Sequence, residues 1–406
     1  MGNEVMRWDL EAVGAQPWVA NTPTTDDVCV HNITMDVGST SERTLVFEQD
    51  LSSMSEPLVV DSGYYQIDRP IESIRSASPN LSDNLEIVIT PKDKSHMIGR
   101  SAHILKGTLR RSVNENFVPM SANASKIDQV QTYVNIFANL GITLLYQMRR
   151  MGHVYTHNNI KFTVSLPSED LDNQTRINEF MLKLCGEYTI EFPRLKVSFD
   201  FSIREEDVVV ASEIEATMYY YFSKHSRNTD DNIFFIEGGG RNISYSGIKE
   251  GIISRDAAFS LPGGGTLLSN LLAKQISQQL NVTRPRLEQM EQVLTTGQWK
   301  MGNTQMDALP CVNAAKEEFA ATVYSGLLRS IDLAGLQANE ISKIVCDGRI
   351  FKEIKAGGHV LSRSIMAILM EKFHDVSPST EFEYTGVDYP VPEGLVAIRI
   401  EEEVQM

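Results

Sequence analysis

An acid stands beside an unusual number of hydrogen-bond donors at residues 33–47. The stretch reads ITMDVGSTSERTLVF, so apolar, strand-forming residues lead into Asp36 and resume after a turn. A plain hairpin turn needs only glycine, asparagine or aspartate. This turn adds the donors Ser39, Thr40, Ser41 and Arg43. Read alone, the stretch is compatible with a plain turn or with an anion-binding loop, and a second element is needed to choose.

A second stretch of the same design follows about 200 residues later. Residues 234–248 read FFIEGGGRNISYSGI, again a strand, an acid at Glu237, a glycine turn and a strand. Two further glycine elements come after it, at residues 263–265 and 347–348. This recurrence indicates an internal duplication and favours a shared function for the two turns.

Glycine turns of this kind suit the binding of phosphate groups, because successive backbone N–H groups form a concave anion-binding nest. A carboxylate beside a phosphate is costly, since unit charges about 4 Å apart interact by about 4 kcal/mol at an effective dielectric constant of about 20. Mg²⁺ removes that cost, because it is held by one or two carboxylates and by phosphate oxygens. Asp36 and Glu237 are therefore candidate metal partners, and Arg43 is a candidate phosphate partner.

The composition limits the classes of function. A chain of 406 residues, of which 42% are hydrophobic, is long enough for two lobes with separate cores. A net charge of −16 argues against direct nucleic-acid binding, which needs a basic surface. The four cysteines are far apart, which favours a reducing, cytoplasmic compartment over a disulfide framework or a zinc site. We expect neither a signal peptide nor a membrane span, and no membrane partner.

The elements that position these turns alternate between strand and helix patterns. Residues 126–151 carry apolar side chains at spacings of three and four, which predicts a long, well-buried helix. Strand-like runs dominate residues 28–90, and helix-like runs alternate with strands in the rest of the chain. This alternation predicts an α/β architecture in two lobes.

Together these motifs resemble those of the actin-like ATPases, and in particular the ParM-type bacterial actins of plasmid segregation. The resemblance extends over roughly residues 30–400. It implies an actin-like fold, in which two lobes are each built on a ribonuclease-H-like mixed sheet with flanking helices. It divides the chain into an N-terminal arm at residues 1–28, a first lobe at residues 29–228 and 375–406, and a second lobe at residues 229–374.

The two turns resemble the two phosphate loops of that family. The first loop is matched by Asp36, Gly38, Ser39 and Thr40. Arg43 stands where the family usually has lysine. The second loop is matched by Gly238, Gly239 and Gly240. There Glu237 replaces an aspartate and Asn242 replaces a threonine. The resemblance implies a metal near Asp36 and Glu237. The two replacements leave open how the metal and the attacking water are held.

Three other segments resemble family motifs. SEIEATMYYYF is similar to the connecting helix, whose acid positions the attacking water; Glu213 fits that acid best and Glu215 is the alternative. The glycine turn and helix that pass near the ribose correspond to Gly264, Lys274 and Gln278. The adenosine motif corresponds to Gly348 and Arg349, and that arginine either stacks on adenine or is solvated.

The resemblance implies an ATP-hydrolysing protein that polymerises head to tail in a Mg²⁺-dependent manner, with GTP as a possible substitute for ATP. It further implies plasmid or phage DNA segregation through a DNA-binding adaptor protein, which suits a chain too acidic to bind DNA itself. The alternative is a non-polymerising phosphotransferase of the sugar- or acetate-kinase kind. Another actin-fold ATPase of the cell-division or chaperone type also stays open, because fold does not decide function.

Overall fold

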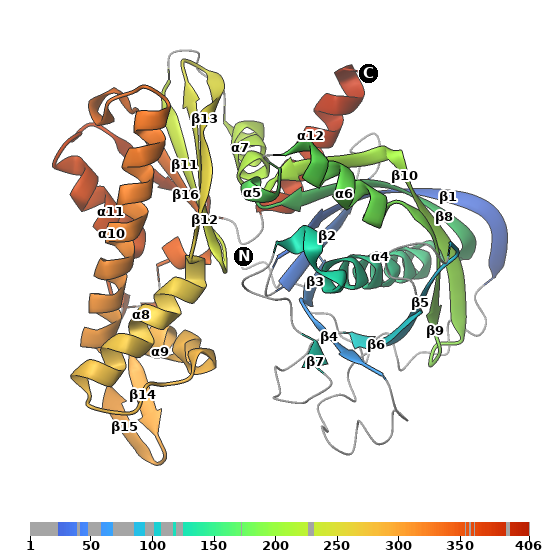
Figure 1. Cartoon of the computed structure of the whole chain (residues 1–406), viewed down its shortest axis with the longest axis horizontal. Helices are drawn as coiled ribbons and strands as arrows, with labels where there is room; N and C mark the ends of the chain where they lie inside the picture. The colour runs from blue at the N-terminus through green and yellow to red at the C-terminus, as the bar shows by residue number, and fades with distance from the viewer. Residues whose placement is uncertain are drawn as a thin grey trace. The chain divides into compact units, whose positions relative to one another are not determined.

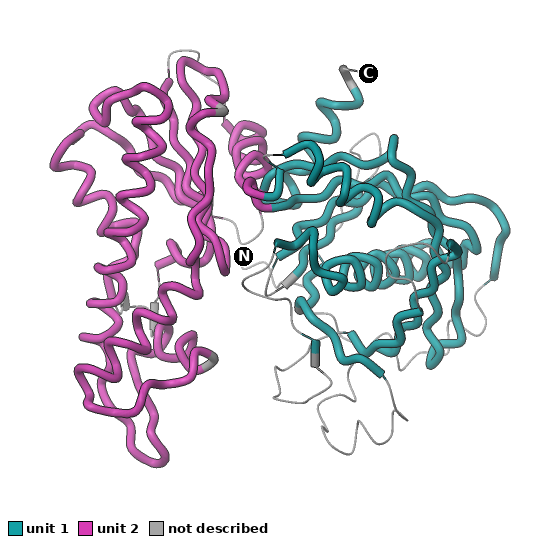
Figure 2. The backbone as a smooth tube through the Cα atoms, viewed as in Figure 1, with its two compact units in different colours: residues 1–166, 170–212, 391–406 teal, residues 167–169, 213–390 magenta. Residues whose placement is uncertain are grey.

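The computed structural model describes residues 23–38, 41–47, 58–67, 85–93, 101–106, 117–118, 125–171, 173–225, 231–353, 355–356, 359–360, 362–386 and 390–405. The chain divides into two compact units (Figure 2). Unit 1 consists of residues 1–166, 170–212 and 391–406, and unit 2 of residues 167–169 and 213–390. The predicted residues Ser39 and Thr40, and most of the predicted arm, lie outside the described residues.

Unit 1 is built on a sheet of ten strands in the order β3-β2-β1-β8-β10-β9-β5-β6-β4-β7. Its first five strands are β3 (Leu58–Asp61), β2 (Ser41–Phe47), β1 (Thr24–Asp36), β8 (Val154–Leu166) and β10 (Val197–Ser212). The others are β9 (Gly186–Phe192), β5 (Leu85–Pro91), β6 (Ala102–Lys106), β4 (Tyr64–Gln66) and β7 (Phe117–Val118). The start of β1 at Thr24 shows that the last residues of the predicted arm belong to the sheet.

The predicted helix at residues 126–151 is the central helix of unit 1. It is α4 (Val130–Met151), preceded by the 3₁₀ turn η2 (Lys126–Asp128). Figure 1 shows α4 on the concave side of the curved sheet, where its apolar side chains join the core. The other helices of unit 1 are α5 (Ser168–Leu171), α6 (Gln174–Leu184) and α12 (Pro390–Gln405), of which the first and last cross its boundaries.

Unit 2 is built on a five-stranded sheet in the order β13-β12-β11-β16-β19. The strands are β11 (Ile233–Gly238), β12 (Asn242–Lys249), β13 (Ile252–Pro262), β16 (Lys343–Asp347) and β19 (Glu381–Tyr384). The helices are α7 (Glu213–Lys224), α8 (Gly264–Gln279), α9 (Met290–Thr296), α10 (Leu309–Leu333) and α11 (Ile365–His374). Smaller elements are the hairpin β14 (Gln298–Met301) and β15 (Thr304–Asp307), the pair β17 (Lys355–Ala356) and β18 (His359–Val360), and the turns η3 (Leu287–Gln289), η4 (Ala338–Glu340) and η5 (Arg349–Phe351).

The two units repeat one sheet topology. In unit 1, β3, β2 and β1 are antiparallel neighbours, and β1, β8 and β10 are parallel neighbours. In unit 2, β13, β12 and β11 are antiparallel, and β11, β16 and β19 are parallel. Each unit therefore contains a 3-2-1-4-5 mixed sheet, which confirms the predicted fold class and agrees with the internal duplication inferred from the two turns.

The unit boundaries differ from the expected lobe boundaries at residues 213–228 and 375–390. The structure groups both segments with unit 2. The reason for the first segment is packing, because Ile214, Met218 and Tyr221 of α7 share a buried cluster with Ile233 and Phe235 of β11. In the second segment, β19 extends the unit 2 sheet by pairing with β16.

No helix among the described residues is long and apolar enough to span a membrane.

Candidate functional site

The first candidate loop begins at the carboxyl end of β1, where Asp36 is held from two sides. In the strand register Asp36 faces Arg43 of β2 and Ser165 of β8. Its carboxylate forms an ion pair with Arg43 and accepts a hydrogen bond of 3.2 Å from Ser165 Oγ. The Asp36 side chain is only 5% exposed. Arg43, which was expected to meet phosphate, therefore neutralises the loop acid in this structure.

The backbone of this loop is also anchored by side chains. The carbonyl oxygen of Val37 accepts a hydrogen bond from the Lys126 ammonium, and the carbonyl oxygen of Gly38 accepts one from Ser62 Oγ. Lys126 belongs to η2 and is 7% exposed. Val37 and Gly38, at the start of the predicted phosphate loop, are thus held by Lys126 and Ser62, which the motifs did not predict.

The second candidate loop begins at the carboxyl end of β11 and packs on the start of α8. The amides of Gly265 and Thr266 donate to the carbonyl oxygens of Gly239 and Gly240, at 2.9 Å and 2.8 Å. Gly264 has a φ of +40°, and a Cβ there would lie 2.3 Å from the Gly239 carbonyl oxygen. Close packing between loop and helix therefore requires glycine at 264, whether or not a ligand is bound.

The acid of the second loop has a neighbour that also carries a carboxylate. Glu237 and Asp347 are register partners at the carboxyl ends of β11 and β16, and they are 8% and 3% exposed. The Asp347 carboxylate accepts a hydrogen bond from Thr385 Oγ1. Gly348 follows with a φ of +99°, and a Cβ there would lie 2.4 Å from the Gly238 carbonyl oxygen. The two glycine elements are therefore packed directly against each other.

The donor chemistry of these acids fits Mg²⁺. Carboxylate oxygens are the ligands it prefers, and one or two of them suffice when phosphate and water supply the rest. Among the residues that the structure describes, no group of three or more acidic, histidine or cysteine side chains is arranged to hold a metal by itself. Asp36 in unit 1 and Glu237 in unit 2 each offer carboxylate oxygens of the kind that bind Mg²⁺ together with phosphate and water.

The two candidate catalytic acids lie in the first turn of α7, directly after β10 ends at Ser212. Glu213 is half-buried, whereas Glu215 is exposed. Ile214 between them faces the core cluster of α7 and β11. The burial difference favours Glu213 as the acid with a defined position, in line with the motif comparison.

The candidate nucleoside-contacting residues are on the surface of unit 2. Lys274 and Gln278 are exposed on α8, and Lys274 pairs with Glu318 of α10 at 3.0 Å. Arg349 is exposed on η5, immediately after Gly348. Asn242, the residue in the threonine position, donates a 2.8 Å hydrogen bond to Glu169 Oε1. These positions stay predictions as ligand contacts.

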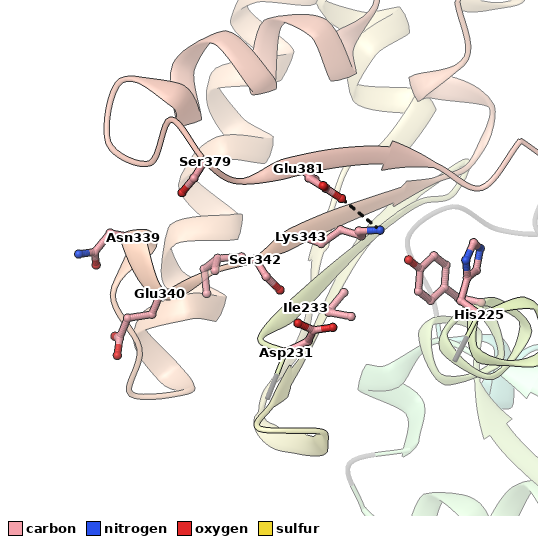
Figure 3. Close-up of a pocket in the computed structure, with 11 residues that line it drawn as sticks. His225, Asp231, Ile233, Asn339, Glu340, Ser342, Lys343, Ser379 and Glu381 are labelled. Carbon is pink, nitrogen blue, oxygen red and sulfur yellow. Dashed lines mark ion pairs between the residues drawn. The ribbon is translucent and has the colours of Figure 1, made fainter. Parts of the chain in front are cut away.

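A polar pocket of about 650 Å³ lies elsewhere in unit 2 (Figure 3). It is formed by the end of α7 and the amino ends of β11, β16 and β19, and Lys343 at its wall pairs with Glu381 at 3.4 Å. The glycine loop is at the opposite, carboxyl edge of the same sheet. The pocket includes no predicted site residue and is separate from the candidate site.

The motif comparison missed the buried polar residues behind the first loop. Glu42 and Lys106 are fully buried, with Glu42 Oε2 3.5 Å from Lys106 Nζ. Asn135 and Asn139 of α4 bond to Lys106 and Glu42 respectively. Burial raises the pKa of Glu42 to about 7, against the opposing effects of Lys106 and Lys126. The sequence did contain one signal for these residues. Asn135 and Asn139 are four residues apart, so they lie on one face of a helix whose other residues are largely apolar.

The comparisons with solved structures identify the fold as actin-like, of the ParM type. A 15-stranded ParM filament from Clostridium botulinum matches with a TM-score of 0.63 and 15% identity, covering 93% of this chain and 100% of that one. The archaeal actin homologue Ta0583 matches with a TM-score of 0.63 and 12% identity, covering 92% and 99%. Bacillus thuringiensis ParM with ATP matches with a TM-score of 0.58 and 12% identity, covering 92% and 99%.

No protein-family model matches the sequence, and no curated protein matches it. The likeness is therefore one of fold, spread over nearly the whole chain. The predicted actin-like, ParM-type fold is confirmed.

Proposed function

We propose that this protein is an actin-like ATPase that polymerises into filaments and releases them after hydrolysis. The observation that carries the proposal is the pair of acid-and-glycine segments at the same place in two sheets of one topology, Asp36–Gly38 at the carboxyl end of β1 and Glu237–Gly240 at the carboxyl end of β11. Similar solved structures include a protein in filament form and one with ATP. ATP is the proposed nucleotide, with GTP as the alternative.

In this proposal the backbone amides of both loops bind phosphate oxygens, at Gly38 in the first loop and at Gly240 in the second, because the Gly239 amide donates to the Asn242 carbonyl oxygen at 3.0 Å and Gly238 is paired with Ile243. Asp36 and Glu237 hold Mg²⁺, which supplies charge neutralisation for the phosphates when bound. Arg43 and Ser165 keep the Asp36 carboxylate in position. Positioning and charge neutralisation carry most of the catalysis of phosphoryl transfer, so no covalent step on the protein is required.

Glu213 is the proposed residue that orients the attacking water. It stands at the first residue of α7, where its backbone is fixed by the end of β10 on one side and by the buried Ile214 on the other. Glu215 is the weaker candidate because it is exposed. Glu213 is therefore the first position to test by substitution.

The proposed setting is plasmid or phage DNA segregation in the cytoplasm. A head-to-tail contact that does not close gives an open filament, and it needs no second protein for growth. A net charge of −16 disfavours direct DNA binding, so a basic adaptor protein is proposed to connect filament and DNA.

Phosphate release and light scattering, recorded together after adding ATP or GTP with Mg²⁺, test this function. Scattering that rises with ATP and then falls as phosphate accumulates is the expected result. Hydrolysis without any polymer, or phosphate transfer to a small acceptor such as a sugar or acetate, would instead support the phosphotransferase alternative. An absence of nucleotide binding would rule out both.

A further inference from the structure

Lys126 places a buried ammonium against the backbone of the first loop. Lys126 is only 7% exposed, and its Nζ donates to the Val37 carbonyl oxygen. Burying a lysine costs free energy unless its charge is well satisfied, and an apolar residue would pack at such a position without that cost. The hydrogen bond to the loop carbonyl offsets part of that cost.

The turn that carries Lys126 is itself fixed on its outer side by α6. Lys183 donates to the Ile127 carbonyl oxygen at 3.1 Å, and Arg176 binds Asp128 at 2.8 Å and 3.0 Å. Ser125 caps the turn by accepting from the Ile127 amide at 3.1 Å. These contacts hold the turn in place, and with it the backbone of Lys126.

The contact fixes the orientation of one peptide group. The carbonyl of Val37 and the amide N–H of Gly38 belong to the same planar, trans peptide and point in opposite directions. Because the carbonyl points to Lys126, the Gly38 N–H points away from it. Glycine readily adopts flipped conformations, and a flipped peptide would present a carbonyl oxygen where an anion needs a donor.

The outgoing strand of the loop is held by a second buried charge. Glu42 on β2 is 3.5 Å from Lys106 Nζ, which also donates to the Gly63 carbonyl oxygen at 3.2 Å. The charges that act on the Glu42 carboxyl include Lys126 and Asp36. Among the described residues that pair with Asp36 and Glu42 or act on their charge, three are cations: Lys106, Lys126 and Arg43.

We propose that Lys126 is a positioning residue that locks the Val37–Gly38 peptide in the orientation in which the first loop binds an anion. The lock acts through the backbone and is present without nucleotide. Its consequence for nucleotide affinity rests on the proposed function, whereas its effect on the loop backbone does not.

The test compares Lys126→Met, Lys126→Arg and the matched control Lys249→Met, whose wild-type lysine also donates to a backbone carbonyl, that of Ala334 in unit 2. Amide hydrogen exchange of β1 and β2 is followed without nucleotide. Lys126→Met is expected to speed exchange at the loop ends of these strands about tenfold, because a charge-assisted hydrogen bond is lost, while Lys249→Met leaves them unchanged. Equal exchange in both variants would overturn the proposal.

The dissociation constant for ATP is the second readout. It should rise about tenfold in Lys126→Met and return toward the wild-type value in Lys126→Arg, with no change in Lys249→Met. An unchanged constant in Lys126→Met would contradict the lock. If the wild-type protein binds no nucleotide, the proposed function fails while the exchange measurement still decides the role of Lys126. If Lys126→Met does not fold, Lys126→Gln, which keeps a donor without the charge, replaces it.

Discussion

At the residue scale, Asp36 has a structural role in this structure and a proposed chemical one. Its carboxylate is bound by Arg43 and Ser165, yet it lies at the start of a loop suited to phosphate. We expect Asp36→Ala to lower the rate of ATP hydrolysis on the order of 100-fold, because charge stabilisation at the phosphates is lost. Phosphate release measures this, with the exposed Asp27 of the same strand replaced by alanine as control. Normal turnover in Asp36→Ala would remove Asp36 from the site.

Glu42 gives a pH-dependent prediction. Its pKa is raised from 4.5 to about 7 in the folded chain, so the folded state holds a proton that the unfolded state has lost within this range. The unfolding free energy therefore falls as the pH rises from about 4.5 to about 7, and stays lowered above that. Glu42→Gln should remove this part of the slope in thermal melts, and the exposed Glu205→Gln should not. An identical slope in all three proteins would show that Glu42 does not titrate in this range.

Residue types at the loops were predictable from sequence, but their partners were not. Asp36, Gly38 and Glu237 stand out because an acid followed by a glycine turn occurs twice, each time at the end of a strand-like run. The pairing of Arg43 with Asp36 was not predicted, because it depends on the register of β1 and β2, which the local sequence does not show. Lys126, Lys106 and Asn139 come from distant segments, and only the fold brings them behind the loop.

At the element scale, the glycine loop of unit 2 packs directly against helix α8. Gly264→Ala forces a Cβ against the Gly239 carbonyl oxygen at a positive φ, so we expect a loss of stability above about 2 kcal/mol. Gly302 also has a positive φ of 60°, but a Cβ there meets nothing within 4 Å. Gly302→Ala is therefore the control, with a cost of about 1 kcal/mol. Denaturant melts giving equal losses would show that contact with the loop is unimportant.

The order of the strands followed only in part from the sequence. The alternation of patterns indicated an α/β fold, and the two similar turns indicated a duplication, which the shared 3-2-1-4-5 order supports. The extension of the unit 1 sheet by β9, β5, β6, β4 and β7 was not foreseen. Pairing of short strands far apart in sequence depends on long-range contacts that local pattern does not encode.

At the scale of the whole molecule, nucleotide hydrolysis is proposed to limit the lifetime of the assembly. Glu213→Ala should therefore form filaments that persist, because the attacking water is no longer oriented while the phosphate loops are intact. Light scattering after a limiting addition of ATP measures the lifetime, with Glu215→Ala as the control. Prompt disassembly in Glu213→Ala, with persistence in Glu215→Ala, would move the role to Glu215.

Sedimentation of the wild-type protein with ATP and Mg²⁺, over a range of protein concentrations, tests the central claim most directly. We predict a critical concentration above which added protein appears in the pellet, and no pellet without nucleotide. Electron micrographs of the pellet should show filaments. Hydrolysis of ATP with all of the protein left in the supernatant at every concentration would contradict the account.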